Sequence, residues 1–252
     1  MSREPLSAVV TTLNNAATLE RCLASLAWAD EIVLLDSGSS DATLAIAEKF
    51  DCRIFSEPFK GYSAQKQSAV DKATHAWILL LDADEALAVG AREHIEKALE
   101  NPQAAGFRLP RREQMFWTFQ HRCSWVNAHL RLFDKRRGKL NEVPVHAAPE
   151  VDGKVIVLRA QMLHYGEPDI HTKVDKINHY STGLVADKLA RGSRFAAARM
   201  LLYPPIFFLR QYIFKRYFLN GWAGYISAAT GAYYVFLKYA KLHEARRRKR
   251  DK

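Results

Sequence analysis

Three carboxylates follow an apolar run in the segment Ile78-Leu79-Leu80-Leu81-Asp82-Ala83-Asp84-Glu85. An apolar run of this length without alternation predicts a central parallel strand that is buried on both faces. Ligands of open α/β sheets bind outside the carboxyl ends of such strands, and residues two apart on a strand point the same way. Asp82 and Asp84 therefore predict a site for Mg²⁺ or Mn²⁺ and chemistry on phosphates. The alternative is a solvated turn in which Asp84 or Glu85 caps the next helix.

Hydrophobic periodicity predicts the elements that position this motif. Four apolar runs predict strands over residues 6–12, 31–36, 52–56 and 76–81. Apolar residues at helical spacing lie between them, and further helices are expected from Tyr62 and over residues 90–99. Strands that alternate with helices through short connections predict an α/β fold with a doubly wound, mostly parallel sheet.

The second half of the sequence has a different pattern. Short β-like runs at residues 106–109, 129–133 and 155–158 are separated by basic and aromatic loops. A helix is predicted over residues 169–190, ending at Gly192. Aromatic and basic residues dominate beyond Arg199, so we expect one α/β domain followed by an appendage, without a second catalytic domain.

Polar side chains end the first two predicted strands. Thr11, Thr12 and Asn14 follow the first, and Asp36 ends the second, where loops face a nucleotide in a doubly wound sheet. A carboxylate there can accept a base imide N–H, which favours uracil or thymine over adenine at Asp36. The alternative for residues 36–41 is a turn and helix cap. The sequence has neither Gly-x-Gly-x-x-Gly after the first strand nor a Walker lysine, which excludes dinucleotide-binding and P-loop classes.

Lys66 is a candidate cation for a phosphate group. It lies on the helix predicted from Tyr62, between Gln65 and Gln67. A lysine at this place could neutralise a phosphate, and the alternative is a solvated helical lysine.

The charge of the 252-residue chain is unevenly distributed. The formal net charge is +10, and residues 238–252 carry eight Lys and Arg against Glu244 and Asp251. The tail therefore supplies +6, and the mildly basic remainder speaks against a nucleic-acid-binding protein. Three widely spaced cysteines argue against a zinc site or a disulfide framework and fit a reducing compartment. The first residues lack the pattern of a secretory signal, so we expect a cytoplasmic location.

Four motifs occur in a fixed order along the first part of the chain. They are Thr-Thr-Leu-Asn-Asn at residues 11–15, Asp-Ser-Gly-Ser-Ser-Asp at 36–41, Gly61-x-x-x-Gln65-Lys66, and Leu-Asp-Ala-Asp-Glu at 81–85. Together they resemble family 2 glycosyltransferases of the GT-A fold. The later stretches Leu130-Arg131-Leu132-Phe133, Leu163-His164-Tyr165 and Gly221-Trp222-Ala223-Gly224 resemble the bacterial lipopolysaccharide-core β-glucosyltransferase branch. The resemblance covers nearly the whole chain.

The resemblance implies an inverting glycosyltransferase that uses a UDP-sugar. Asp36 would contact the uracil and Asp82 the ribose or the sugar. Asp84 would bind a Mg²⁺ or Mn²⁺ ion that bridges the diphosphate, and His164 would add a second metal ligand.

Sugar transfer also needs a base for the acceptor hydroxyl. Past the metal motif, only residues 141–146 place a carboxylate and a histidine together in a turn-rich loop. We therefore expect Glu142 to be the base, with His146 as the competitor. The alternative is a polar surface loop.

Residues 217–237 carry no charged side chain and are long enough to span a bilayer. Glycines and polar residues dilute their apolar character, however, and Arg210, Lys215 and Arg216 interleave with aromatics just upstream. This favours a helix that lies in the plane of the membrane interface. The alternative is a hairpin packed on the catalytic domain.

The resemblance implies transfer of a hexose, with glucose as the first candidate, from a UDP-sugar to a heptose of the lipopolysaccharide inner core. We expect this reaction at the cytoplasmic face of the inner membrane. The catalytic domain is expected over residues 1–198, with a nucleotide-sugar half (1–103) and an acceptor half (104–198). Residues 199–252 are expected to associate with the membrane surface, and no nucleic acid is expected as a partner. The alternatives are transfer to another lipid-linked glycan, a metal-dependent phosphohydrolase, and a basic nucleic-acid-binding protein.

Overall fold

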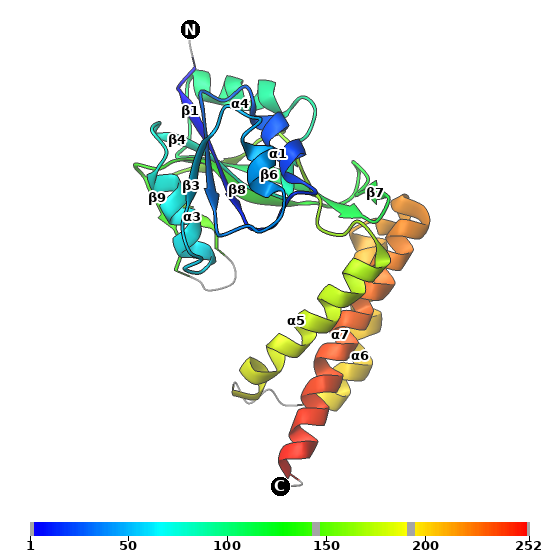
Figure 1. The fold of residues 1–252 in the computed structure, drawn as a ribbon. Coiled ribbons are helices and arrows are strands. Elements are labelled where there is room, and N and C mark those ends of the chain that lie inside the picture. The colour runs from blue at the N-terminus through cyan, green and yellow to red at the C-terminus, as the bar shows by residue number, and fades with distance from the viewer. Residues whose placement is uncertain (1–2, 143–146, 191–194, 251–252) are drawn as a thin grey trace. The chain divides into compact units, whose positions relative to one another are not determined.

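The computed structural model describes residues 3–142, 147–190 and 195–250, and the chain forms two compact units (Figure 1). The first unit contains Met1–Arg112 and Asn127–Tyr165, and the second contains Glu113–Val126 and Gly166–Lys252. These units are defined by packing, whereas the boundary expected at residue 198 separates a catalytic part from a membrane-associating part. The two differ because helix α5 (Ile170–Ala190) packs against helix α7 (Gly221–Arg250).

Four parallel strands form one side of the sheet in the first unit. They are β1 (Leu6–Thr12), β2 (Glu31–Asp36), β3 (Arg53–Ser56) and β4 (Trp77–Asp82), in the order β3-β2-β1-β4. The predicted parallel sheet is confirmed, with two small shifts. β4 lies one residue later than predicted, and β3 starts at Arg53 because the Cys52 N–H closes a turn on the Phe50 carbonyl.

The sheet continues beyond β4 with antiparallel partners, in the order β4-β8-β6-β12-β5. The bounds are β5 (Glu85–Leu87), β6 (Gly106–Met115), β8 (Asn127–Asp134) and β12 (Met162–His164). Two shorter strands, β7 (Thr118–Phe119) and β11 (Val155–Val157), pair with β6, and β9 (Gly138–Leu140) pairs with β10 (Pro149–Val151). The predicted β-like runs are therefore strands, and β6 is longer than expected because its last residues pair with β7.

Helices cover both faces of the parallel strands, as a doubly wound sheet requires (Figure 1). Side chains alternate along each strand, so Leu6, Ala8 and Val10 face one core and Val9 faces the other. The first core is closed by α1 (Leu19–Leu26), α2 (Thr43–Ala47) and α4 (Ala91–Glu100), and the second by α3 (Tyr62–Asp71). Packing on both faces fixes the position of each strand in the sheet, and therefore the position of its carboxyl end.

The second unit is mainly helical. It contains α5, α6 (Ala196–Leu209), a π-helical turn η1 (Arg210–Phe214), a 3₁₀ turn η2 (Tyr217–Asn220) and α7. The helix predicted over residues 169–190 is confirmed as α5, and its expected end at Gly192 lies outside the described residues. The apolar segment 217–237 is divided between η2 and α7 rather than forming one helix. No helix in the described part of the chain is both long and apolar enough to cross a membrane.

Candidate active site

The carboxyl ends of β1, β2 and β4 meet at one edge of the first unit's sheet. The register pairs Thr12 with Asp36 across β1 and β2, and Thr11 with Asp82 across β1 and β4. Residues from three distant segments thus lie in one row. The structure brings together these four of the predicted donor-site residues, as the α/β pattern required.

Asp36 is buried and holds the loop that follows its own strand. Its Oδ2 accepts the backbone N–H groups of Gly38 and Ser39, both at 2.9 Å, and its Oδ1 accepts the Ser39 hydroxyl at 2.5 Å. The turn reading of residues 36–41 is therefore realised around Asp36 itself. The bond from the Ser39 hydroxyl uses one acceptor site of Oδ1.

The loops after β1 and β2 are joined by side-chain hydrogen bonds. The Asn14 N–H donates to Ser39 Oγ at 2.8 Å, and the Ser40 N–H donates to Asn14 Oδ1 at 2.8 Å. Asp41 accepts the N–H groups of Ala16 (3.2 Å) and Thr43 (3.0 Å). Asn14 therefore joins the loops after β1 and β2, and Asp41 has the structural role that its place before a helix predicted.

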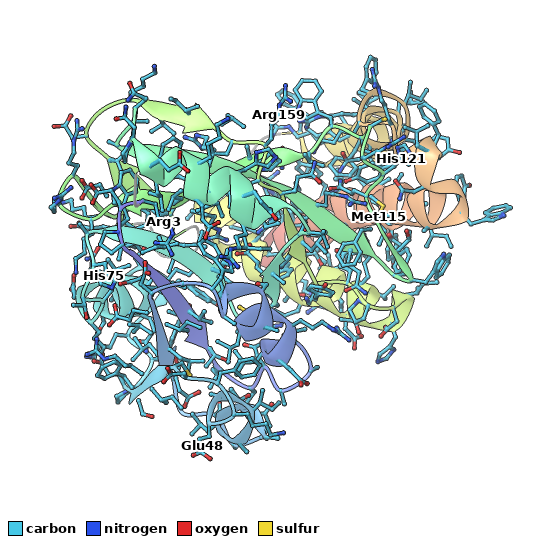
Figure 2. The ribbon with its side chains drawn as sticks, turned by 90° about the horizontal axis from the view of Figure 1, so that it is seen from above. Arg3, Glu48, His75, Met115, His121 and Arg159 are labelled. Atoms are coloured by element: carbon cyan, nitrogen blue, oxygen red, sulfur yellow. The ribbon has the colours of Figure 1, made fainter. Side chains whose placement is uncertain are left out.

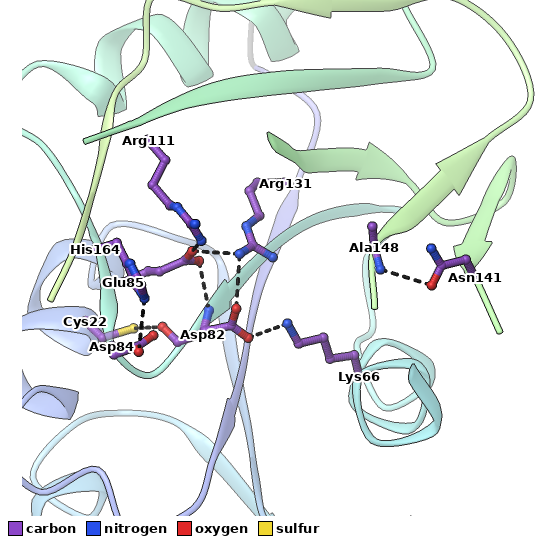
Figure 3. Close-up of polar contacts among 10 residues, drawn as sticks. All are labelled: Cys22, Lys66, Asp82, Asp84, Glu85, Arg111, Arg131, Asn141, Ala148 and His164. Carbon is purple, nitrogen blue, oxygen red and sulfur yellow. Dashed lines mark hydrogen bonds and ion pairs between the residues drawn. The ribbon is translucent and has the colours of Figure 1, made fainter. Parts of the chain in front are cut away.

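Asp82 lies between two cations (Figure 3). Lys66 Nζ is 2.5 Å from its Oδ1, and Arg131 Nη2 is 3.1 Å from its Oδ2. Burial alone would raise the pKa of Asp82, but the charges of Arg131 and Lys66 outweigh it, so the pKa is held well below its ordinary value. Lys66 is itself buried, and the alternative of a solvated helical lysine is wrong, because α3 lays this residue against the end of β4.

A buried carboxylate next to Asp82 was missed in the sequence. Glu85 is fully buried at the start of β5, where it accepts from Arg131 Nη2 at 2.7 Å and from Arg111 Nη1 at 2.9 Å. Its other oxygen accepts the Asp82 N–H at 3.2 Å. Glu85 is therefore not a solvated helix cap. Lys66, Arg111 and Arg131 neutralise the charges of Asp82 and Glu85.

Asp84 occupies a different position from the one its spacing predicts. β4 ends at Asp82, and Asp84 lies in the turn between β4 and β5, so the two side chains do not share one side of a strand. The strand geometry on which the expectation of a common direction rested ends at Asp82 and does not extend to Asp84. The turn places Asp84 Oδ2 at 3.2 Å from Nε2 of His164, the last residue of β12 (Figure 3).

The pair of Asp84 and His164 fits a divalent ion in its chemistry. Each side chain is partly exposed, 33% for Asp84 and 24% for His164, so both can reach a ligand from solvent. A carboxylate oxygen and an imidazole nitrogen are ligands that Mn²⁺ accepts. Within the described residues, no group of three or more His, Cys, Asp and Glu side chains is arranged to hold a metal, so the ion's remaining ligands would come from substrate or water.

Glu142 is exposed at the start of a segment whose base is attached to α3. Asn141 closes this base on Ala148, with its N–H to the Ala148 carbonyl at 3.0 Å and its Oδ1 accepting the Ala148 N–H at 3.2 Å (Figure 3). The Leu140 N–H donates to Gln67 on α3 at 2.8 Å. Glu142 thus follows directly after a residue fixed to the helix that carries Lys66. The second candidate base, His146, lies outside the described residues.

Comparisons with known proteins relate the chain to a family. The family model described as "Glycosyl transferase family 2" matches residues 7–150. The chain is 32% identical over 249 residues to the lipopolysaccharide core biosynthesis glycosyltransferase LpsC of Rhizobium meliloti. The matched region covers 95% of this chain and 92% of that protein. It is 28% identical over 256 residues to an uncharacterized glycosyltransferase of Rickettsia felis, spanning 96% and 90% of the two chains.

The fold also resembles a solved structure. The crystal structure of S. aureus TarS 1-349 matches with a TM-score of 0.50 over 94% of this chain and 91% of that chain, at 14% identity. At this identity the match speaks for the fold alone, and it confirms the predicted GT-A-type architecture. Because the family model covers more than half of the chain and LpsC matches nearly all of it, the chain belongs to glycosyl transferase family 2.

Proposed function

We propose that this glycosyltransferase transfers a hexose from a UDP-sugar to a heptose of the lipopolysaccharide inner core, with glucose as the first candidate for the hexose. The observation that carries the proposal is the strand register that aligns Asp36, Thr12, Thr11 and Asp82 along one edge of the sheet. A uridine at the end of β2 and a diphosphate at the end of β4 would follow this row.

The donor would be held by groups with matching charge. Asp36 accepts the uracil imide N–H through the remaining acceptor site of its Oδ1. Thr11, Thr12 and Asn14 border the nucleoside, and Asp82 receives the ribose or the sugar. Lys66 and Arg131 place two cations at the end of β4, where they favour binding of the diphosphate.

Asp84 and His164 would hold the Mg²⁺ or Mn²⁺ ion. Asp82 is already neutralised by two cations, which leaves Asp84 as the motif carboxylate best suited to a metal. Bound there, a divalent ion would stabilise the charge that develops on the leaving diphosphate.

Glu142 would remove the proton of the acceptor hydroxyl while that oxygen attacks the anomeric carbon opposite the diphosphate, which inverts the configuration. The attachment of its segment to α3 supports this role, because α3 also carries Lys66 at the diphosphate site. His146 remains the competing candidate.

The acceptor and the location rest on the relationship to LpsC, whose name assigns it to lipopolysaccharide core biosynthesis. We place the enzyme on the cytoplasmic face of the inner membrane, with catalysis in residues 1–198 and membrane association in residues 199–252. The basic tail favours this, because each Lys or Arg near an anionic surface contributes about 1 kcal/mol. Transfer to another lipid-linked glycan is the second candidate.

The proposal is tested by incubating the purified protein with labelled UDP-glucose, Mn²⁺ and lipopolysaccharide whose core ends in heptose. Label in the lipopolysaccharide with an inverted anomeric linkage is expected. Label in another lipid-linked glycan alone would move the acceptor assignment to the second candidate. Free phosphate released without acceptor would indicate a phosphohydrolase, and a salt-dependent shift of duplex DNA without sugar transfer would indicate a nucleic-acid-binding protein.

A further inference from the structure

The outer side of α6 carries a row of apolar side chains that face solvent in the second unit. Leu202, Ile206, Leu209 and Ile213 recur at helical spacing through α6 and η1, and each is between 48% and 61% exposed. Soluble monomers seldom expose a contiguous apolar surface of this kind. We name these four residues the α6 stripe.

The stripe leads into a turn that is rich in exposed aromatic residues. Trp222, at the start of α7, is 76% exposed, and Phe214 and Phe218 from η1 and η2 are also exposed. Trp125 belongs to the same end of the unit, because its N–H donates to the Lys215 carbonyl at 3.3 Å. These four residues form the aromatic tip.

The segment that bears Trp125 is firmly attached to this turn. The Ser124 hydroxyl donates to the Arg216 carbonyl at 3.3 Å, and the His121 N–H donates to Asn220 Oδ1 at 3.1 Å. Figure 2 shows the labelled His121 beside the coil of η1 and η2. Hydrogen bonds from both backbone and side-chain groups therefore attach the segment that bears Trp125 to the turn that bears Phe214 and Phe218.

The segment that carries the stripe and most of the tip bears cations, and Glu113 is a carboxylate that lies near its Lys215. From residue 196 to residue 243 the sequence contains six Lys and Arg and no Asp or Glu. Arg210 and Arg216 are exposed on the elements that carry the stripe and the tip. A second copy of the chain would bring these cations against each other, whereas an anionic lipid surface would neutralise them.

The packing of α7 shows why the surface lies on α6. Ala223, Ala228, Val235, Tyr239 and Leu242 of α7 are buried within the unit, in clusters with residues of the neighbouring helices. α7 thus supports α6 from the inside. The expectation of one helix over residues 217–237 needs correction, because the segment is divided between η2 and α7.

We propose that the α6 stripe and the aromatic tip rest on an anionic phospholipid bilayer, with α6 parallel to the surface and the tryptophans at the headgroup level. Apolar side chains on one face of a helix, rimmed by Arg and Lys, are what an interfacial helix requires, and tryptophan prefers the membrane–water boundary. The inference deepens the proposed function and rests on its assumption that the acceptor is lipid-linked.

Flotation of the full chain with phosphatidylglycerol-containing vesicles tests the proposal. Leu202→Glu/Ile206→Glu is expected to lower the bound fraction at least tenfold. The matched control is Tyr233→Glu/Phe236→Glu on α7, where both wild-type side chains are exposed outside the stripe. The vesicle-bound fraction of this variant is expected to lie within twofold of that of the wild type. Wild-type flotation by the α6 variant, or loss of flotation by the α7 variant alone, would overturn the proposal.

Trp222→Ala provides a second variant that does not add charge to the helix. It is expected to weaken flotation severalfold and to reduce the blue shift of tryptophan fluorescence on addition of vesicles. A concentration-dependent dimer that Leu202→Glu/Ile206→Glu abolishes, without flotation of the wild type, would assign the surface to a second copy instead and contradict the proposal.

UDP binding separates this inference from the proposed function. The α6 variant should keep the thermal shift that UDP and Mn²⁺ give to the wild type, which also shows that it is folded. If the wild type floats but shows no UDP shift, the proposed function fails and the membrane surface stands. If UDP binds and the wild type does not float, the membrane surface fails alone.

Discussion

His164 Nε2 lies 3.2 Å from Asp84 Oδ2, although the two residues are 80 positions apart in the chain. Strand β12 produces this approach by pairing antiparallel with β5, which sets His164 opposite Glu85. A turn carboxylate and a strand-end imidazole are thereby presented together next to the balanced Lys66–Asp82 pair. The proposal that the enzyme uses a divalent ion depends on this pair of Asp84 and His164.

Asp84→Asn should remove the part of UDP binding that depends on metal. Ligand binding to the native state raises its stability, by about 2.7 kcal/mol at a hundredfold excess over the dissociation constant. We expect UDP with Mn²⁺ to raise the melting temperature of the wild type more than UDP alone, and this difference to vanish in Asp84→Asn and to shrink in His164→Ala.

The matched control is Asp51→Asn, which changes an exposed carboxylate between α2 and β3. It should keep the full effect of Mn²⁺. An undiminished effect of Mn²⁺ in Asp84→Asn would show that another group holds the ion.

Arg131→Met should destabilise the fold, because it leaves buried Glu85 with Arg111 as its remaining cation. Removing one partner of a buried ion pair costs about 3–5 kcal/mol. Because Arg111 remains, we expect the free energy of unfolding to fall by about 3 kcal/mol. Urea unfolding measures this change. Lys139→Met on β9, an exposed position, should change stability by less than about 0.5 kcal/mol. Equal stability of the two variants would contradict the role given to Arg131.

Glu31 should make the stability of the first unit depend on acid. Burial alone would raise its pKa, but hydrogen bonds from Ser7, Thr74 and Arg53 outweigh it and lower the pKa from 4.5 to about 2. Because the folded pKa is depressed, the stabilisation is complete above pH 4.5 and is lost as the pH falls towards 2.

Glu31→Gln should therefore cost about 1–3 kcal/mol at neutral pH, since hydrogen bonds to a charged group are lost. The difference between wild type and variant should shrink below pH 4.5. Denaturant unfolding at pH 7, 4 and 3 measures it. A difference that is the same at all three values would rule out the ionised carboxylate as the cause.

Glu142→Gln should lower turnover about a hundredfold or more while UDP binding stays intact, given the usual contribution of a general base. Its exposed position means that the substitution should leave stability unchanged. Steady-state transfer rates and the UDP thermal shift separate the two effects. Near-normal turnover would exclude Glu142 as the base and favour His146.

The sequence predicted those parts of the site that depend on local pattern. Buried strands followed by polar residues located Thr11, Thr12, Asp36 and Asp82, because parallel strands in a doubly wound sheet end at a common edge. The turn at Ala83 and Asp84 was predicted only as an alternative, because no Gly or Pro marks it in the sequence.

The other misses concern contacts between distant segments. Arg131 and Glu85 are 46 positions apart and meet only because β8 pairs with β4. Nothing in the local sequence marks that pairing. The role of His164 as a metal ligand was predicted from family resemblance alone, since a single histidine after an apolar run predicts no partner. The burial of one side of α7 was likewise not predicted, because glycine, serine and threonine interrupt its apolar residues.

Anomalous X-ray diffraction from crystals grown with UDP and Mn²⁺ tests the central claim most directly. The account predicts a manganese peak within coordination distance of both Asp84 and His164, with the diphosphate supplying further ligands. A peak elsewhere, with Asp84 turned away from the ion, would contradict the assignment of this motif as the metal centre.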